Sequence, residues 1–265
     1  MRNILKKKDC ANKTFTIVSV GKTKSDTVSK PLHINKSESN NAPALESHYK
    51  AMIDKGLDAD KIELVVTDML AAYKEVVKST FPGALHQWCV FHVIQLLNGF
   101  FKHTLKEHRH KTFKAGERKA AHKTSFLILK GQEKLTDGEK EEIISFCERF
   151  PDMAACYALK EDIRMLYAYS ETEIQAVAFR DILIDQYENK IPQSMNKVLD
   201  FLVKEFEPTI SYLKVGALHS KTNNDAERIM RKIKQMQKVH YCFRKDENFM
   251  RHIKVLLGLD VVVAA

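Results

Sequence analysis

A change of pattern near residue 93 most constrains how this chain can fold. Up to that point the 265-residue sequence contains short runs of β-branched and aromatic residues separated by turn residues, which predict strands. From about residue 93 to 218 these runs give way to segments with apolar residues at helical spacing. The sequence therefore predicts a mixed α/β fold interrupted by a large all-helical insertion.

The region before the insertion predicts a sheet covered by helices. Strands are expected over 13–21, 28–34, 62–68 and 84–93, and helices over 44–56 and 70–83. The first two strands flank turn residues and would pair as a hairpin, and a helix–strand–helix–strand order follows. One more long helix is expected after the insertion, over 222–239. We therefore divide the chain into a first core segment, a helical insertion and a C-terminal core segment, at 1–95, 96–218 and 219–265.

Capping residues indicate where helices begin inside the insertion. Thr136 and Asp137 precede an acidic first turn, and Ser170 stands three residues before Glu173. The second spacing is that of a capping box, in which two side chains satisfy backbone N–H groups reciprocally. We expect a helix to begin at each place.

Composition excludes several classes of protein. No run reaches the roughly 18 apolar residues that a membrane span requires. The start, MRNILKKKD, lacks the apolar segment of a signal peptide. Five cysteines are a sparse, odd set, which argues against a disulfide framework. We expect a cytoplasmic protein without a membrane partner, associated with the nucleoid if its source is a prokaryote.

The formal charge of +9 is unevenly distributed. Basic residues outnumber acidic ones by eight to two in 1–30 and in 101–124, and by nine to two in 228–254. In 132–188, fourteen acidic residues face six basic ones. Basic segments suit a nucleic acid, because phosphate neutralisation supplies most non-specific affinity, although each run also fits a solvated helix face. The candidate DNA contacts in the second segment are Lys102, Lys106, Arg109 and Lys111.

Asp68 is the first acid that could support chemistry. It ends the apolar run IELVVTD (62–68), and the carboxyl ends of strands are where α/β sheets place their ligands. An aspartate at this point can equally be the N-cap of the following helix. The residues alone leave both interpretations open.

Glu227 is the second such acid, at the head of a basic stripe on the last long helix. At 100° per residue, Glu227 shares one side of the helix with Arg231, Lys234 and Lys238, beside an apolar face. This pattern suits a metal-binding carboxylate next to a phosphate track. The other interpretation is an ion pair between Glu227 and Arg231 on a solvated helix, worth about 0.2–0.5 kcal/mol.

Three segments together resemble the catalytic domain of DDE transposases from insertion sequences. They are VVTDMLAAYKEVVKSTFPGALHQWCVFHVIQLLN (65–98), LTDGEKEEIISFCERFPDMAACYALKEDIRMLYAY (135–169) and SKTNNDAERIMRKIKQMQKVHYCFRKDENFMRHI (220–253). The resemblance covers most of the chain from about residue 60 onward. It implies a ribonuclease H-like fold whose mixed sheet is interrupted by the helical insertion.

The same resemblance implies a catalytic activity and its partners. Asp68 would be the second acid of the family's triad and Glu227 the third, and both would bind Mg²⁺ or Mn²⁺. Two such ions, roughly 3.5–4 Å apart, stabilise the attacking and leaving oxygens of a phosphodiester. The implied activity is metal-dependent DNA strand cleavage and strand transfer. The implied partners are transposon-end DNA, target DNA and further copies of the chain.

The first acid of the family pattern has no clear counterpart. Its strand would fall in MRNILKKK, which contains no acid. Asp9 and Asp26 are two candidates, and a third alternative is that the chain is N-terminally truncated and lacks this acid. A non-catalytic DNA-binding remnant of a transposase is therefore an alternative function. A helical module that binds a basic protein through 132–188 is another.

Cys89 and His92 form a C-x₂-H pair, which resembles a pattern in Mutator-like transposases, and His86 stands nearby. Zinc uses such ligands, but it requires about four, and no second pair occurs at a usual spacing. We favour a structural or phosphate-contacting role for Cys89, His92 and Asn224.

Overall fold

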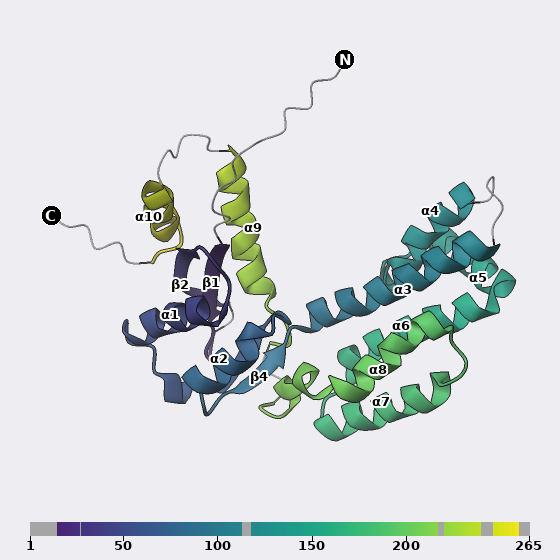
Figure 1. Ribbon diagram of the computed structural model, residues 1–265, viewed down its shortest axis with the longest axis horizontal. Coiled ribbons are helices and arrows are strands. Elements are labelled where there is room, and N and C mark those ends of the chain that lie inside the picture. Colours follow the sequence, from purple (N-terminus) through teal and green to yellow (C-terminus); the bar gives the residue numbers. More distant parts are fainter. Residues whose placement is uncertain (1–14, 27, 113–117, 217–219, 240–245, 260–265) are drawn as a thin grey trace, which may run out of the picture. The chain divides into compact units, whose positions relative to one another are not determined.

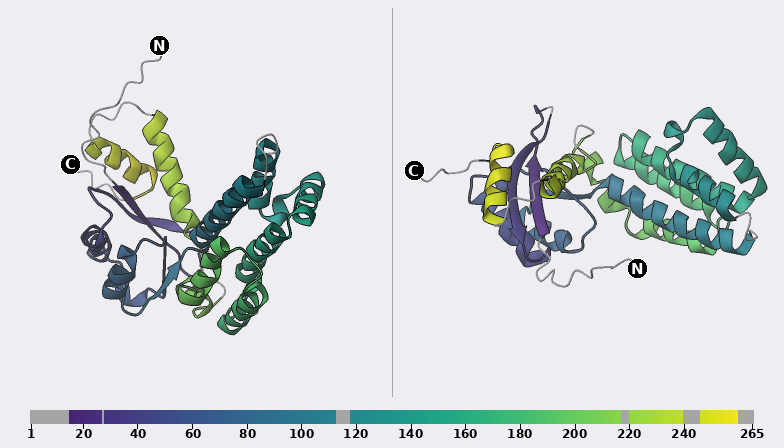
Figure 2. Two further views of the ribbon diagram at one scale, coloured as in Figure 1. Left: turned by 45° about the vertical axis from the view of Figure 1, so that its right-hand side comes forward. Right: turned by 90° about the horizontal axis from the view of Figure 1, so that it is seen from above.

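The computed structural model describes residues 15–26, 28–112, 118–216, 220–239 and 246–259. In this part of the chain the protein is mixed α/β and mostly helical, and it divides into two compact units (Figures 1 and 2). Unit 1 comprises residues 1–86 and 223–265, and unit 2 comprises residues 87–222. Unit 1 is thus discontinuous in sequence, and unit 2 is inserted within it.

Unit 1 carries the strands and the helices that cover them. Its elements are β1 (Phe15–Gly21), β2 (Lys30–Ser37), α1 (Ala42–Ile53), β3 (Leu64–Thr67), α2 (Ala72–Thr80), α9 (Asn224–Val239), α10 (Asp246–Leu256) and the start of β4 (Leu85–Trp88). The strand predicted over 84–93 is wrong at its end. It stops at Trp88, because the apolar residues that follow belong to the buried face of a helix that begins at Val90.

The described strands form two two-stranded sheets, β1–β2 and β3–β4. β1 and β2 are antiparallel, with Ile17 opposite Asn35 and an irregularity between Ser19 and Val20. β3 and β4 are joined through α2. The single open sheet expected from the sequence is not seen in the described ranges, because no hydrogen-bonded ladder there joins the two pairs.

Helices pack on both faces of the β1–β2 hairpin, because successive side chains of a strand point to opposite faces. On one face, Ile17 packs in a core with residues of α1 and α2. On the other face, Val18, Val20 and Ile34 pack with residues of α9 and α10, and α9 runs beside the strands in Figure 1. The hairpin therefore fixes the helix that carries Glu227.

Unit 2 consists of helices joined by turns. They are α3 (Val90–Thr112), α4 (Arg118–Leu129), α5 (Asp137–Arg149), α6 (Pro151–Tyr169), α7 (Glu173–Tyr187) and α8 (Asn196–Lys204). In the described part of the chain, no helix combines the length and apolar character needed to cross a membrane.

The chain enters and leaves unit 2 at neighbouring points. The Val90 N–H donates to the Lys221 carbonyl oxygen at 3.0 Å. The buried amide of Gln87 donates to the Thr209 carbonyl oxygen at 2.7 Å and accepts from the Tyr212 N–H at 2.9 Å. These bonds hold the two connections together, as an inserted unit requires.

The capping predictions have different outcomes. Thr136 and Glu139 form the capping box of α5, which confirms that helix start. The box predicted for Ser170 and Glu173 is wrong. α6 continues to Tyr169, so Ser170 is its C-cap, and Thr172 with Gln175 forms the box of α7.

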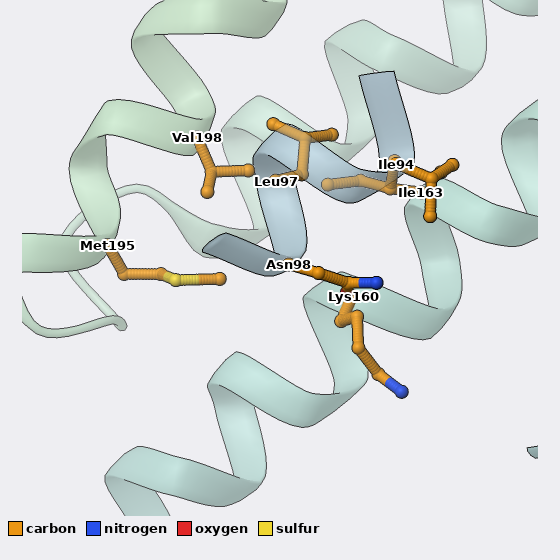
Figure 3. Close-up of a pocket in the computed structure, with 7 residues that line it drawn as sticks. All are labelled: Ile94, Leu97, Asn98, Lys160, Ile163, Met195 and Val198. Atoms are coloured by element: carbon orange, nitrogen blue, oxygen red, sulfur yellow. The ribbon is translucent and has the colours of Figure 1, made fainter. Parts of the chain in front are cut away.

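Unit 2 encloses a cavity of only about 10 Å³ among α3, α6 and the start of α8 (Figure 3). Its lining is apolar apart from Asn98 and Lys160. Lys160 points away from Met195 and Val198, and its ammonium donates to the Lys130 carbonyl oxygen at 2.6 Å and pairs with Glu161. A space of this size accommodates about one water molecule. The cavity is therefore too small for a substrate.

Candidate catalytic acids and nucleic-acid interface

Asp68 directly follows β3, in the turn that leads to α2. Its Oδ1 atom accepts a hydrogen bond from the Leu70 N–H at 3.1 Å. α2 begins only at Ala72 and has no side-chain cap, so Asp68 is not the N-cap of that helix. The half-buried carboxylate instead stabilises the turn at the carboxyl end of the strand.

Two tyrosines share the environment of Asp68. Burial, with a smaller contribution from the negative charge of Asp68, raises the pKa of Tyr73 to about 12. Burial also raises the pKa of Tyr49, with further contributions from Tyr73 and Asp68. Both phenols therefore keep their protons at neutral pH and add no charge of their own near Asp68.

Thr67 and His86 connect the ends of β3 and β4 beside Asp68. The Thr67 hydroxyl lies 2.7 Å from the Asp68 carbonyl oxygen and 2.7 Å from Nε2 of His86. Thr67 is only 5% exposed. Burial lowers the pKa of His86, and the charge of Lys74 lowers it further, so the imidazole is neutral at physiological pH.

Glu227 lies in the first turn of α9, and its N–H donates to the Asn223 carbonyl oxygen at 3.1 Å. The start of α9 is tied to the connection between β1 and β2, because Asp225 accepts a hydrogen bond from Ser29 at 2.5 Å. Glu227 itself is half-buried. The ion pair between Glu227 and Arg231 stays a prediction.

Asp68 and Glu227 belong to the same compact unit, although all of unit 2 separates them in the sequence. Asp9 lies outside the described residues. Asp26 lies between β1 and β2, where it accepts from Thr23 and pairs with Lys30 at 2.9 Å. Its contacts are those of a turn residue.

A metal site in this region would depend on these carboxylates. Among the described residues, no group of three or more His, Cys, Asp or Glu side chains is arranged to hold a metal ion. Mg²⁺ nevertheless often binds through one or two carboxylates, with water and substrate phosphate oxygens as its other ligands. Two carboxylates in one unit thus suit a hard divalent cation by the chemistry of their oxygens.

The basic residues predicted on α3 lie in unit 2. Their spacing puts Lys102, Lys106 and Arg109 on one side of the helix, and Lys111 lies elsewhere around it. The three lysines are exposed and Arg109 is half-buried. The adjoining side is buried and includes Phe101 and Leu105. α3 can thus present cations to an anion while its other face packs in the core.

The second basic stripe lies on α9, in unit 1. Arg231 and Lys234 are exposed, as is Asn224 at the first residue of the helix. Lys238 belongs to α9, but its side chain lies outside the described part. Ile229 and Ile233 are buried against the hairpin, so the helix is amphipathic in the way the sequence predicts.

The comparison with known families decides the identity of the chain. The sequence model of a DDE-type family, the ISL3 group, described as transposase, matches residues 10–253. The chain belongs to this transposase family. The match includes both Asp68 and Glu227 and spans unit 2 entirely. No curated protein matches the chain at a significant level.

In this transposase, Cys89 and His92 lie at the start of unit 2. Cys89 is fully buried between β4 and α3. His92 is half-buried and its ring lies edge-on to Phe91, with centroids 5.7 Å apart. The described residues do not add a third His, Cys, Asp or Glu to this pair. A structural or phosphate-contacting role for these two residues stays a prediction.

Sequence reasoning missed several residues of the transposase that surround the acids. Thr67 and His86 were parts of strand patterns, and Tyr49 and Tyr73 were parts of helix patterns. Ser29 carried no signal for its contact with Asp225, which is far away in the sequence. Only the proximity of His86 to the C-x₂-H pair could have drawn attention to it.

Proposed function

We propose that this chain is the catalytic domain of an insertion-sequence transposase, with a ribonuclease H-like unit 1 and a helical insertion as unit 2. Asp68 and Glu227 would bind Mg²⁺ or Mn²⁺ and act in DNA strand cleavage and strand transfer. The substrates would be the DNA ends of the element and a target DNA. Several copies of the chain would assemble in the active complex.

One observation carries this proposal. The chain leaves unit 1 after His86 and returns to it at Asn223, so that Glu227 rejoins the unit that contains Asp68. Two half-buried carboxylates from distant segments thus belong to one fold, within a match to a transposase family that spans both.

The residues have separable roles in the proposed reaction. The ions, when bound, would stabilise charge on the attacking and leaving oxygens and lower the pKa of water. Asp68 is oriented by its bond to the Leu70 N–H. The phenols of Tyr49 and Tyr73 stay neutral and so add no negative charge near it. Arg231 and Lys234 would position the DNA by contacting its phosphates. Such contacts do not distinguish one base sequence from another.

The catalytic proposal predicts that Asp68→Asn and Glu227→Gln each abolish nicking and strand transfer. Each change keeps the shape of the side chain but removes the negative charge that holds a divalent cation. The measurement uses supercoiled DNA that carries the element's ends, in Mg²⁺ and in Mn²⁺. A loss of at least about 100-fold is expected, because removal of a metal ligand exceeds the 10–100-fold cost of losing an outer partner.

Matched controls are available in the same unit. Asp60→Asn and Glu46→Gln change exposed acids near α1 and should leave cleavage unchanged. If Asp68→Asn and Glu227→Gln cleave as well as these controls, the two acids are not catalytic. If no variant cleaves but all bind DNA at low salt, the chain is a non-catalytic DNA-binding protein.

A further inference from the structure

We propose that Thr67 and His86 are positioning residues for Asp68: together they hold the main chain of the candidate catalytic acid through a two-step hydrogen-bond relay. This inference rests on the proposed function of Asp68. It concerns residues that the comparison with the transposase family does not assign, and it follows from the distances around one buried hydroxyl.

The direction of each hydrogen bond follows from the number of protons available. The Thr67 hydroxyl has one proton, and its neighbours at 2.7 Å are the Asp68 carbonyl oxygen and Nε2 of His86. A carbonyl oxygen can only accept, so the hydroxyl donates to Asp68. Nε2 of His86 must then donate to the hydroxyl oxygen, which makes His86 the Nε2–H tautomer.

The relay restrains Asp68 on the side of its backbone. The Thr67 hydroxyl fixes the Asp68 carbonyl, and the Leu70 N–H fixes Oδ1 of the carboxylate at 3.1 Å. Together these bonds restrain the peptide plane and the side chain of the acid. In the described residues, neither bond uses Oδ2, so this oxygen remains available to a ligand.

The contacts come from both strands of the β3–β4 sheet. Thr67 is the last residue of β3 and His86 lies within β4, so the relay ties Asp68 to the neighbouring strand as well as to its own. Because Thr67 is buried, water competes poorly for these bonds. Metal ligands depend on such outer partners, whose removal typically costs 10–100-fold in metal affinity or activity.

The test separates positioning from a general effect on folding. Thr67→Val removes the hydroxyl at nearly constant volume, and Thr67→Ser restores it. His86→Leu removes the donor, and His86→Gln places an amide N–H near the position of Nε2. For each full-length variant we would measure nicking across a Mg²⁺ titration, together with DNA affinity at low salt and the free energy of unfolding in urea.

The proposal expects Thr67→Val and His86→Leu to raise the Mg²⁺ concentration for half-maximal nicking by about 10-fold or more. Thr67→Ser and His86→Gln should recover most of this loss, and DNA affinity should not change. Equal Mg²⁺ dependence of nicking in Thr67→Val and Thr67→Ser would overturn the proposal. So would losses of nicking that are proportional to each variant's loss of unfolding free energy.

The failure of this inference can be told apart from failure of the proposed function. If Asp68→Asn keeps its activity, Asp68 is not catalytic and the proposed function fails. If Asp68→Asn is inactive while Thr67→Val and His86→Leu match the unaltered protein at every Mg²⁺ concentration, only the positioning role fails.

Discussion

His48 illustrates how a single buried side chain can make the stability of unit 1 depend on pH. It is completely buried. Nδ1 lies 2.7 Å from Oδ1 of Asn35 and Nε2 lies 2.8 Å from the Ser19 hydroxyl. Since Oδ1 only accepts, Nδ1 carries the proton and Nε2 accepts from Ser19. The neutral imidazole thus links α1 to both strands of the hairpin.

Burial, with a smaller contribution from the nearby His33, lowers the pKa of His48 to about 3. The unfolded chain takes up this proton near pH 6.5, so between pH 6.5 and 3 it binds more protons than the folded chain. Stability therefore falls as the pH falls through this window. From pH 7 to 5, the free energy of unfolding should decrease on the order of 1–2 kcal/mol.

Urea unfolding at pH 7 and pH 5 checks this expectation. His48→Gln removes the titrating group, so the difference between the two pH values should shrink. His33 also has a lowered pKa, caused first by burial and then by Lys55 and Lys254, and some pH dependence should therefore persist. An unchanged difference in His48→Gln would show that acid destabilisation arises elsewhere.

Among single residues, the sequence allowed some positions to be predicted and not others. Asp68 was a candidate because it ends an apolar strand pattern, and Glu227 was a candidate because it begins a basic stripe on a helix. The N-cap alternative for Asp68 could not be excluded from the sequence, because nothing in it shows that α2 begins only at Ala72, five residues after β3 ends at Thr67. Thr67 and Ser29 were not candidates, and His86 was noted only beside the C-x₂-H pair, since each acts through a partner that only the folded chain brings near.

At the scale of elements, α9 shows how one helix can serve the core and the surface together. Its buried residues Ile229 and Ile233 pack on the hairpin, and its exposed residues include Arg231, Lys232 and Lys234. The position of Glu227 therefore depends on apolar packing within the next two turns of the same helix.

Ile233→Ala should destabilise the protein by about 2–5 kcal/mol, because Ile233 is only 1% exposed and its loss would leave a cavity against β1 and β2. Lys232→Ala, at the next exposed position, should change stability by less than about 0.5 kcal/mol. Urea unfolding followed by circular dichroism gives both values. Similar values for the two variants would contradict the packing of α9 on the hairpin.

Element boundaries were the least predictable part of the fold. The hairpin strands and α1 were expected within a few residues of where they lie, since turn residues bound them. The end of β4 was missed because no glycine or proline separates Trp88 from Val90, and a short apolar run fits a strand or a buried helix equally well. Ser170 and Thr172 are both residues that can cap a helix, so the sequence did not show which of them begins α7.

At the scale of the whole molecule, basic surface occurs in both units. α3 contributes Lys102 and Lys106 in unit 2, and α9 contributes Arg231 and Lys234 in unit 1. The acidic residues concentrate in 132–188, also in unit 2. The charge pattern and the helical insertion were predictable from the sequence. The pairing of the strands was not, because it depends on contacts between distant segments.

DNA affinity should depend steeply on salt. The logarithm of the association constant should fall linearly with the logarithm of salt concentration, with a slope of about −0.9 for each phosphate neutralised. Replacing both Lys102 and Lys106 by alanine should make the slope less steep by about 1–2 and weaken binding to all sequences alike. Titrations between low and physiological salt measure this.

Lys140→Ala is the matched control for these titrations, because Lys140 is exposed on α5 and pairs with Asp137 at 2.9 Å. Its slope should equal that of the unaltered protein. If the α3 variant shares that slope, α3 does not contact phosphates. If no binding occurs even at low salt, the protein does not use its basic surfaces on DNA.

The discontinuity of unit 1 sets the order in which a ribosome can supply its parts. Asp68 emerges early, but α9, which covers one face of the hairpin, follows only after all of residues 87–222 have been made. At about 5–20 residues per second, this takes roughly 7–27 s. During that interval the apolar face of the nascent hairpin lacks its covering helix. A chaperone that binds exposed apolar strands would have its longest opportunity there, and an unfinished chain cannot hold both acids.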